Sequence, residues 1–235
     1  LGVGLGSNVI IIENVRGAKD SPEMWEATNA LESSGYSVEC KILCAADYGV
    51  PQERYRIFLV GTRGKWSFMW PRQDPRHVTV KEALSVLPVP AHGPLVSEAD
   101  NEYAQGIRTK KWRATREVID LNAPSKTILT EKTRFLVPRA GRHHYLSVDE
   151  SLRLQSFPPE FSFRDSVPEK TRYRLNGNAV PPKLSAAVAM GLIICDMLPS
   201  GQSTQTASSP DTVRHLPHAD SDCGTGPMLG GGGAG

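Results

Sequence analysis

Residues 10–16 read Ile-Ile-Ile-Glu-Asn-Val-Arg, a run of β-branched residues that ends on a carboxylate and an amide. Such a run is typical of a strand buried on both faces of a parallel sheet. A carboxylate at the end of that strand is costly unless a partner stabilises it, and open α/β sheets bind ligands at the carboxyl ends of their strands. Glu13 is therefore a candidate site residue; the alternative is a strand end whose Glu faces water.

Three further segments follow in order along the chain. Residues 48–56 read Tyr-Gly-Val-Pro-Gln-Glu-Arg-Tyr-Arg, residues 154–158 read Leu-Gln-Ser-Phe-Pro, and residues 177–181 read Gly-Asn-Ala-Val-Pro. With Glu13-Asn14-Val15, this series resembles the C-terminal motifs of the cytosine-C5 DNA methyltransferases across residues 8–195. Any one motif is a weak signal, but four in the family's order indicate this family.

The resemblance implies a chemistry. In the family, a cysteine thiolate attacks C6 of cytosine, and C5 then accepts a methyl group from S-adenosylmethionine. A carboxylate at N3 and a guanidinium near O2 stabilise the charge that develops on the ring. The resemblance assigns these two roles to Glu13 and Arg56, and it assigns cofactor contacts to Asn178 and Val180.

The spacing of Gln52, Arg54 and Arg56 has a physical meaning, because side chains at i and i+2 of a strand share a face. Two neighbouring guanidiniums are tolerated where an anion lies between them, so we expect one to hold the base and the other a DNA phosphate. We assign Arg56 to the base, and we expect Arg54 and Gln52 to contact the DNA. One alternative is that the two arginines have the reverse roles. The other is an edge strand whose arginines are solvated. We expect Gln155 and Phe157 to be scaffold.

The composition, with 39% hydrophobic and 22% charged residues, is that of an ordinary soluble protein. No apolar run reaches the roughly 18 residues that span a bilayer, so no membrane partner is predicted. The four cysteines show no CxxC pairing, and we expect them to be reduced and buried in an intracellular protein; they are Cys40, Cys44, Cys195 and Cys223.

Hydrophobic patterning predicts strands over residues 8–12, 36–43 and 56–62, with a helix over 21–33 that starts at Ser21-Pro22. Two capping boxes predict two more helix starts, Thr79 with Glu82 and Ser147 with Glu150, and Pro181-Pro182 open another helix. We expect the segment Asn176-Gly177-Asn178-Ala179-Val180 to be a turn in which glycine permits positive φ.

The predicted fold class is α/β: a partial doubly wound (Rossmann-like) methyltransferase sheet with a small, mostly irregular recognition segment. The predicted parts are the second half of the catalytic α/β domain, a short target-recognition segment, C-terminal helices that return to the catalytic domain, and a disordered tail rich in Ser, Thr, Gly and Pro. Their bounds are residues 1–63, 64–145, 146–199 and 200–235.

Positive charge is concentrated between residues 108 and 142, where ten Lys or Arg residues face three acids in a chain of net charge +2. This concentration predicts contact with a polyanion, with Lys110, Lys111 and Arg113 touching double-stranded DNA; a solvated basic face is the alternative. Trp112 could stack on a base, but packing in a small core is favoured.

Two family features are missing from the sequence. The run Gly2, Gly4, Gly6 has no helix after it and is not the family's cofactor turn, and no cysteine follows a proline. The chain also begins without Met, so we expect an incomplete chain or one subunit of a split enzyme, inactive until a complementary chain supplies the cofactor turn and the cysteine. The alternatives are a non-catalytic DNA-binding or regulatory relative and a tRNA cytosine-C5 methyltransferase. A DNA substrate implies the nucleus in a eukaryote and the cytoplasm or nucleoid in a bacterium.

Overall fold

A computed structural model describes residues 2, 4, 6–64, 66–85, 87, 95–105, 117–130 and 135–197. The chain divides into two units, residues 1–199 and residues 200–235, and the second unit lies outside the described residues. The predicted disordered tail is therefore not described, and neither is Cys223 within it.

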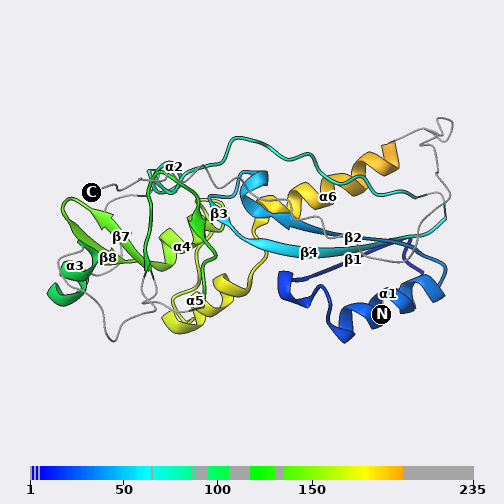
Figure 1. The fold of residues 1–235 in the computed structure, drawn as a ribbon, viewed down its shortest axis with the longest axis horizontal. Coiled ribbons are helices and arrows are strands. Elements are labelled where there is room, and N and C mark those ends of the chain that lie inside the picture. Colours follow the sequence, from blue (N-terminus) through cyan, green and yellow to red (C-terminus); the bar gives the residue numbers. More distant parts are fainter. Residues whose placement is uncertain are drawn as a thin grey trace, which may run out of the picture. The chain divides into compact units, whose positions relative to one another are not determined.

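Three strands near the N-terminus form one sheet in the order β1-β4-β2. Both outer strands pair antiparallel with β4, so β1 and β2 run in the same direction with β4 reversed between them (Figure 1). The elements of this region are β1 (Val9–Val15), α1 (Pro22–Ser33), β2 (Ser37–Cys44), β4 (Tyr55–Thr62) and the 3-10 helices η1 (Arg16–Ala18) and η2 (Ala45–Tyr48).

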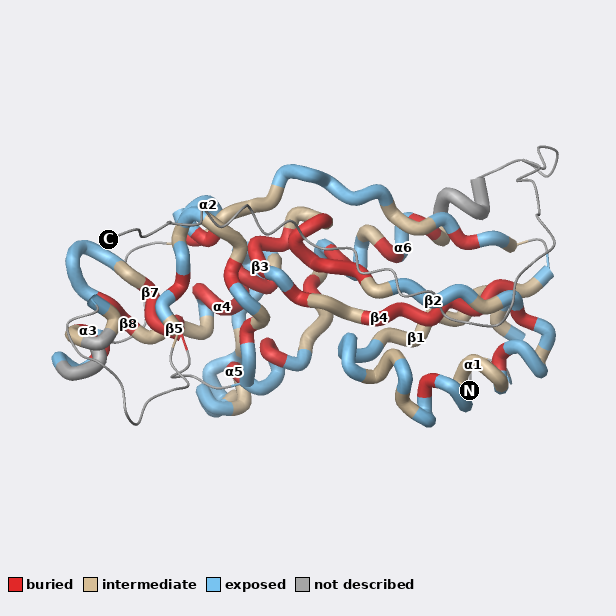
Figure 2. Tube along the Cα trace, in the orientation of Figure 1, coloured by how far each residue is buried: buried red, intermediate tan, exposed pale blue. Residues whose placement is uncertain are grey.

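Alternate residues of this sheet enter two different cores, one on each face. On one face Ile57 and Leu59 of β4 pack with Met24 and Leu31 of α1. The core on the other face consists of apolar residues from the sheet, from η2, from Phe68 and from α6 (Pro182–Met197). The sheet thus lies between α1 and α6, and buried residues follow most of β4 (Figure 2).

The expectation of a parallel strand buried on both faces is wrong for β1. Its isoleucines are only half-buried, with Ile11 on the α6 side and Ile10 and Ile12 on the α1 side, and its paired neighbour is antiparallel. An apolar run predicts that both faces are covered, but it carries no information on the direction of the neighbouring strand. The fold is mixed α/β, and the described residues do not form a doubly wound parallel sheet.

A second group of elements surrounds its own apolar core, which includes Val80, Ile128, Phe135 and Leu154. Strands β5, β7 and β8 form a three-stranded sheet, and β3 pairs with β6. The elements are β3 (Gln52–Glu53), α2 (Val80–Leu84), α3 (Glu98–Ala104), β5 (Glu117–Val118), β6 (Ser125–Lys126), β7 (Phe135–Arg139), β8 (Arg142–Tyr145), α4 (Val148–Leu154) and α5 (Glu169–Asn178). Within the segment 64–145 the described elements are short, and the domain boundaries stay a prediction.

The predicted helix starts are confirmed. Ser21 caps α1, and both capping boxes form complete reciprocal hydrogen bonds at the starts of α2 and α4. Among the described residues no helix has the length and apolarity to cross a membrane. The prediction of buried thiols holds for Cys44, but Cys40 is exposed on β2.

Candidate active site

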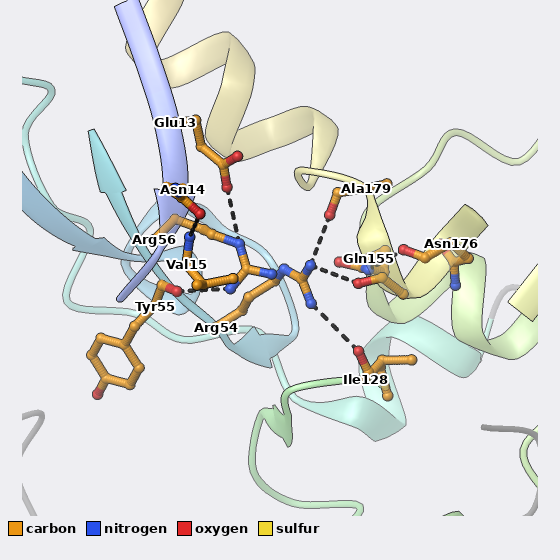
Figure 3. Close-up of polar contacts among 11 residues, drawn as sticks. Glu13, Asn14, Val15, Arg54, Tyr55, Arg56, Ile128, Gln155, Asn176 and Ala179 are labelled. Atoms are coloured by element: carbon orange, nitrogen blue, oxygen red, sulfur yellow. Dashed lines mark hydrogen bonds and ion pairs between the residues drawn. The ribbon is translucent and has the colours of Figure 1, made fainter. Parts of the chain in front are cut away.

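The carboxylate of Glu13 and the guanidinium of Arg56 lie in direct contact at the end of the sheet (Figure 3). Nε of Arg56 is 2.9 Å from Oε1 of Glu13, and the side chains are 11% and 27% exposed, respectively. The two side chains to which the resemblance assigns one base therefore lie side by side, and their roles toward that base stay a prediction. Their partial exposure leaves part of each group open to a ligand.

Strand register explains this contact. Val15 pairs with Arg56 and Glu13 with Phe58, so the side chains of all four residues project from the same face of the β1–β4 ladder. Phe58 belongs to the core on the α6 side of the sheet. The Glu13–Arg56 pair therefore continues an apolar face to the point where β1 ends, and it replaces hydrocarbon with charge there.

The charges of this pair are partly desolvated. Burial lowers the pKa of Arg56, while the contact with Glu13 acts in the opposite direction. Nη1 of Arg56 also donates to the carbonyl oxygen of Tyr55 at 2.8 Å, which fixes the plane of the guanidinium. A carboxylate and an oriented guanidinium held 2.9 Å apart can bind a planar group that carries adjacent donor and acceptor atoms.

The prediction that Gln52, Arg54 and Arg56 line one surface is wrong. Gln52 and Arg54 are 0% exposed, so neither offers an atom to a DNA phosphate in this structure. The i, i+2 rule fails because the chain leaves β3 before Arg54 and enters β4 only at Tyr55. The two side chains turn inward and bind protein groups instead.

A buried polar network joins three of the sequence motifs. Nε2 of Gln52 donates to the carbonyl oxygen of Leu154 at 3.1 Å and to Oε1 of Gln155 at 3.3 Å. Gln155 in turn donates to the carbonyl oxygen of Asn176 at 2.6 Å. Gln155 is therefore scaffold, as expected. Asn176, which the sequence predicts only as part of a turn, also donates to Oγ of Ser151 at 2.9 Å.

The segment 176–180 is not the predicted turn. Asn176, Gly177 and Asn178 form the last turn of α5, and Gly177 is not among the residues with positive φ. Glycine is needed for a different reason: a Cβ at position 177 would lie 2.9 Å from the carbonyl carbon of Leu129. Asn178 is exposed and Val180 is half-buried against the α6-side core, so both stay candidates for the cofactor contacts.

The remaining predicted DNA contacts cannot be placed. Lys110, Lys111 and Arg113 lie outside the described residues, as does Trp112. Within the described residues no group of three or more His, Cys, Asp or Glu side chains could hold a metal ion.

Sequence comparisons connect this geometry with a known family. The family model for C-5 cytosine-specific DNA methylase matches residues 6–87 and 71–193. Two similar proteins are the type II methyltransferase M.AplI of Arthrospira platensis, with 31% identity over 197 residues, and M.MthTI of Methanothermobacter thermautotrophicus, with 32% identity over 212 residues. The matches cover 77% and 76% of this chain, but only 55% and 64% of those relatives.

Solved structures agree with the fold. A crystal structure of the S. pombe Dnmt2 methyltransferase has a TM-score of 0.64 at 18% identity and covers 80% of this chain and 66% of its own. A structure of the Entamoeba histolytica methyltransferase EhMeth has a TM-score of 0.60 at 17% identity, covering 81% and 63%. With the family model matched along most of the sequence, the chain belongs to the C-5 cytosine-specific DNA methylase family.

Proposed function

We propose that this chain supplies the base-binding pair and one wall of the cofactor site of an S-adenosylmethionine-dependent DNA (cytosine-5-)-methyltransferase. The 2.9 Å contact between Glu13 and Arg56 at the end of β1 carries the proposal. The chain's share of the relatives' length, 55% for M.AplI, is consistent with a contribution to a larger catalytic unit.

In this proposal the Glu13 carboxylate accepts a hydrogen bond from the protonated N3 of an extruded cytosine, and Arg56 donates to O2. Addition of the thiolate at C6 pushes electrons toward N3 and O2. The N3 proton, held by Glu13, and the Arg56 guanidinium take up that negative charge, so the pair stabilises the transition state more than the ground state. The core behind the pair excludes water from one side, which strengthens each contact.

S-adenosylmethionine supplies the methyl group when it is bound. The exposed amide of Asn178 offers donors and an acceptor, and the half-buried side chain of Val180 offers an apolar contact. These groups suit one wall of a pocket for a ligand with polar and apolar parts.

The nucleophile has to come from elsewhere, because no cysteine of this sequence follows a proline. Cys44, the buried cysteine of the sheet, is at the end of β2 rather than β1. Among the described residues β1 pairs only with β4, so its other edge is open to a further strand. We propose that a complementary polypeptide with the glycine-rich turn and the Pro-Cys dipeptide pairs with this edge.

Double-stranded DNA is the proposed substrate, with the basic stretch at residues 108–142 as its contact. Two alternatives make different predictions. A tRNA cytosine methyltransferase would modify tRNA in preference to DNA, and a non-catalytic relative would bind DNA without turnover even when complemented.

The test measures transfer of the labelled methyl group from S-adenosylmethionine to duplex DNA and to tRNA. The chain alone is expected to transfer none, and the chain with a polypeptide that carries the glycine-rich turn and Pro-Cys is expected to methylate DNA. Turnover by the chain alone would contradict the external nucleophile. Preference for tRNA would select the first alternative, and DNA binding without turnover in the complemented protein would select the second.

A further inference from the structure

Arg54 is fully buried and binds only backbone oxygens among the described residues. Its Nη2 donates to the carbonyl oxygens of Gly177 at 2.7 Å and of Ala179 at 3.0 Å, and its Nη1 donates to that of Ile128 at 3.4 Å (Figure 3). Its Nε has no hydrogen-bond partner in this part of the chain. These contacts connect the residue that precedes β4 with the end of α5, which lies more than 120 residues later in the sequence.

A buried guanidinium without a carboxylate partner is costly. Burial, and after it the neighbouring charge of Arg56, lower the pKa of Arg54 to about 10, while the charge of Glu13 acts in the opposite direction. A packing role alone would be filled at lower cost by an apolar side chain of similar volume. One nitrogen of the guanidinium, Nη2, donates to both Gly177 and Ala179, while the other arm, Nη1, donates to Ile128.

Those two carbonyl groups flank Asn178, the exposed candidate for the cofactor contact. The backbone of Leu129 and Thr130 also lies so close to Gly177 that no Cβ fits there. The backbone beside Asn178 is thus held by Arg54 and by this close approach, while the side chain of Asn178 stays exposed. Two residues beyond Arg54, Arg56 holds Glu13.

We propose that Arg54 is a positioning residue. It holds the segment 177–180, which includes the end of α5 and is called the loop below, at a fixed distance from the Glu13–Arg56 pair. We call its hydrogen bonds to Gly177 and Ala179 the clamp. The role of this loop in cofactor binding rests on the proposed function, whereas the clamp itself does not. Arg54 touches neither base nor phosphate: it acts through the Gly177 and Ala179 carbonyl groups.

Arg153 offers a matched control. It is a second buried arginine, 7% exposed, whose Nη1 and Nη2 donate to the carbonyl oxygens of Phe157 and Phe161 and whose Nε is also unpaired among the described residues. Each clamp lies beside a backbone amide whose exchange can be followed. The amide of Ala179 donates to Leu175 and Asn176, and the amide of Phe157 donates to Leu152.

The experiment compares Arg54→Met, Arg54→Lys and Arg153→Met in the full chain by hydrogen–deuterium exchange, with thermal unfolding to correct for global stability. Arg54→Met should speed exchange at Ala179 about tenfold more than at Phe157, as expected for the loss of charge-assisted hydrogen bonds, and Arg153→Met should do the reverse. Arg54→Lys should restore part of the protection at Ala179. Equal exchange at Ala179 in wild type and Arg54→Met, or an equal change in Arg153→Met, would overturn the clamp.

A second experiment tests the role of Arg54 in cofactor binding. It measures the dissociation constant of S-adenosylhomocysteine for the same variants in the complemented protein, that is, the chain together with the polypeptide that carries the glycine-rich turn and Pro-Cys. Arg54→Met should weaken binding by about tenfold with Arg153→Met unchanged, on the same reasoning. Unchanged binding in Arg54→Met would remove Arg54 from cofactor positioning. No binding by wild type, together with the expected exchange pattern, would contradict the proposed function and leave the clamp standing.

Discussion

At the scale of single residues, the same motif contains side chains with opposite roles. Arg56 is partly exposed beside Glu13, whereas Arg54, two positions earlier, is fully buried. Both types occur in one five-residue motif because the chain is irregular at Arg54, which turns that side chain toward α5. Alternation along a strand therefore could not have predicted which arginine faces a ligand.

Gly177 gives a residue-scale prediction. Gly177→Ala would place a Cβ within 3.0 Å of backbone atoms of Leu129 and Thr130, and backbone cannot rotate away as a side chain can. The free energy of unfolding should fall by about 1–3 kcal/mol, the range of overpacked cores. Urea denaturation measures this change.

The control is Gly17→Ala, because a Cβ at Gly17 meets nothing within 4 Å. Its unfolding midpoint should stay close to that of wild type. Equal midpoints for Gly177→Ala and Gly17→Ala would show that the close approach at α5 does not constrain this position.

At the scale of elements, the sequence predicts the starts of helices well, but it does not predict which strands pair or in which direction. The caps at Ser21, Thr79 and Ser147 were read from short-range hydrogen-bonding chemistry, and each forms as predicted. Helix α5 was missed because its sequence is polar and lacks an apolar stripe. The β7–β8 hairpin around Ala140-Gly141 is not predicted, because β7 contains a proline and β8, Arg142–Tyr145, lacks alternating apolar residues.

Strand β8 contains a histidine whose titration should be visible in stability. Burial and the neighbouring His144 lower the pKa of His143, and its Nδ1 lies 3.0 Å from Oδ1 of Asn101. The unfolded chain, with a histidine pKa near ~6.5, therefore binds more protons than the folded chain just below that pH. The free energy of unfolding should fall as pH drops through this range and level off below the folded-state pKa.

Chemical denaturation at a series of pH values between about 7 and 5 measures this slope. His143→Gln should give a flatter pH dependence than wild type, whatever its absolute stability. An identical slope in the variant would exclude His143 as the source.

At the scale of the whole molecule, the chain carries the proposed base-binding pair and a candidate cofactor segment on a fold shared with known methyltransferases. Three of the four motifs that indicate the family are joined by buried contacts, Gln52 to Gln155 and Arg54 to Gly177. The antiparallel direction of the β1–β4 pair cannot be predicted from the sequence, since the residues of β1 carry no information on the direction of the neighbouring strand.

DNA binding is predicted at this scale from the charge of residues 108–142. Each phosphate contact adds about −0.9 to the slope of log K against log salt concentration. Replacing Lys110, Lys111 and Arg113 by Gln should make the slope measured by fluorescence anisotropy shallower by about 2–3. The control replaces three exposed cations elsewhere, Lys81, Arg164 and Lys170, and should leave the slope unchanged; equal effects of both triple variants would mean that net charge alone sets the affinity.

The central claim is that Glu13 stabilises the reacting cytosine, and the rate of methyl transfer by the complemented protein tests it most directly. Glu13→Gln should lower that rate by about 10² or more, the scale of one transition-state contact. The exposed Glu53→Gln, which removes the same charge from β3, should leave the rate within about twofold of wild type, the small effect usual for surface substitutions. A Glu13→Gln variant as fast as wild type would contradict the account.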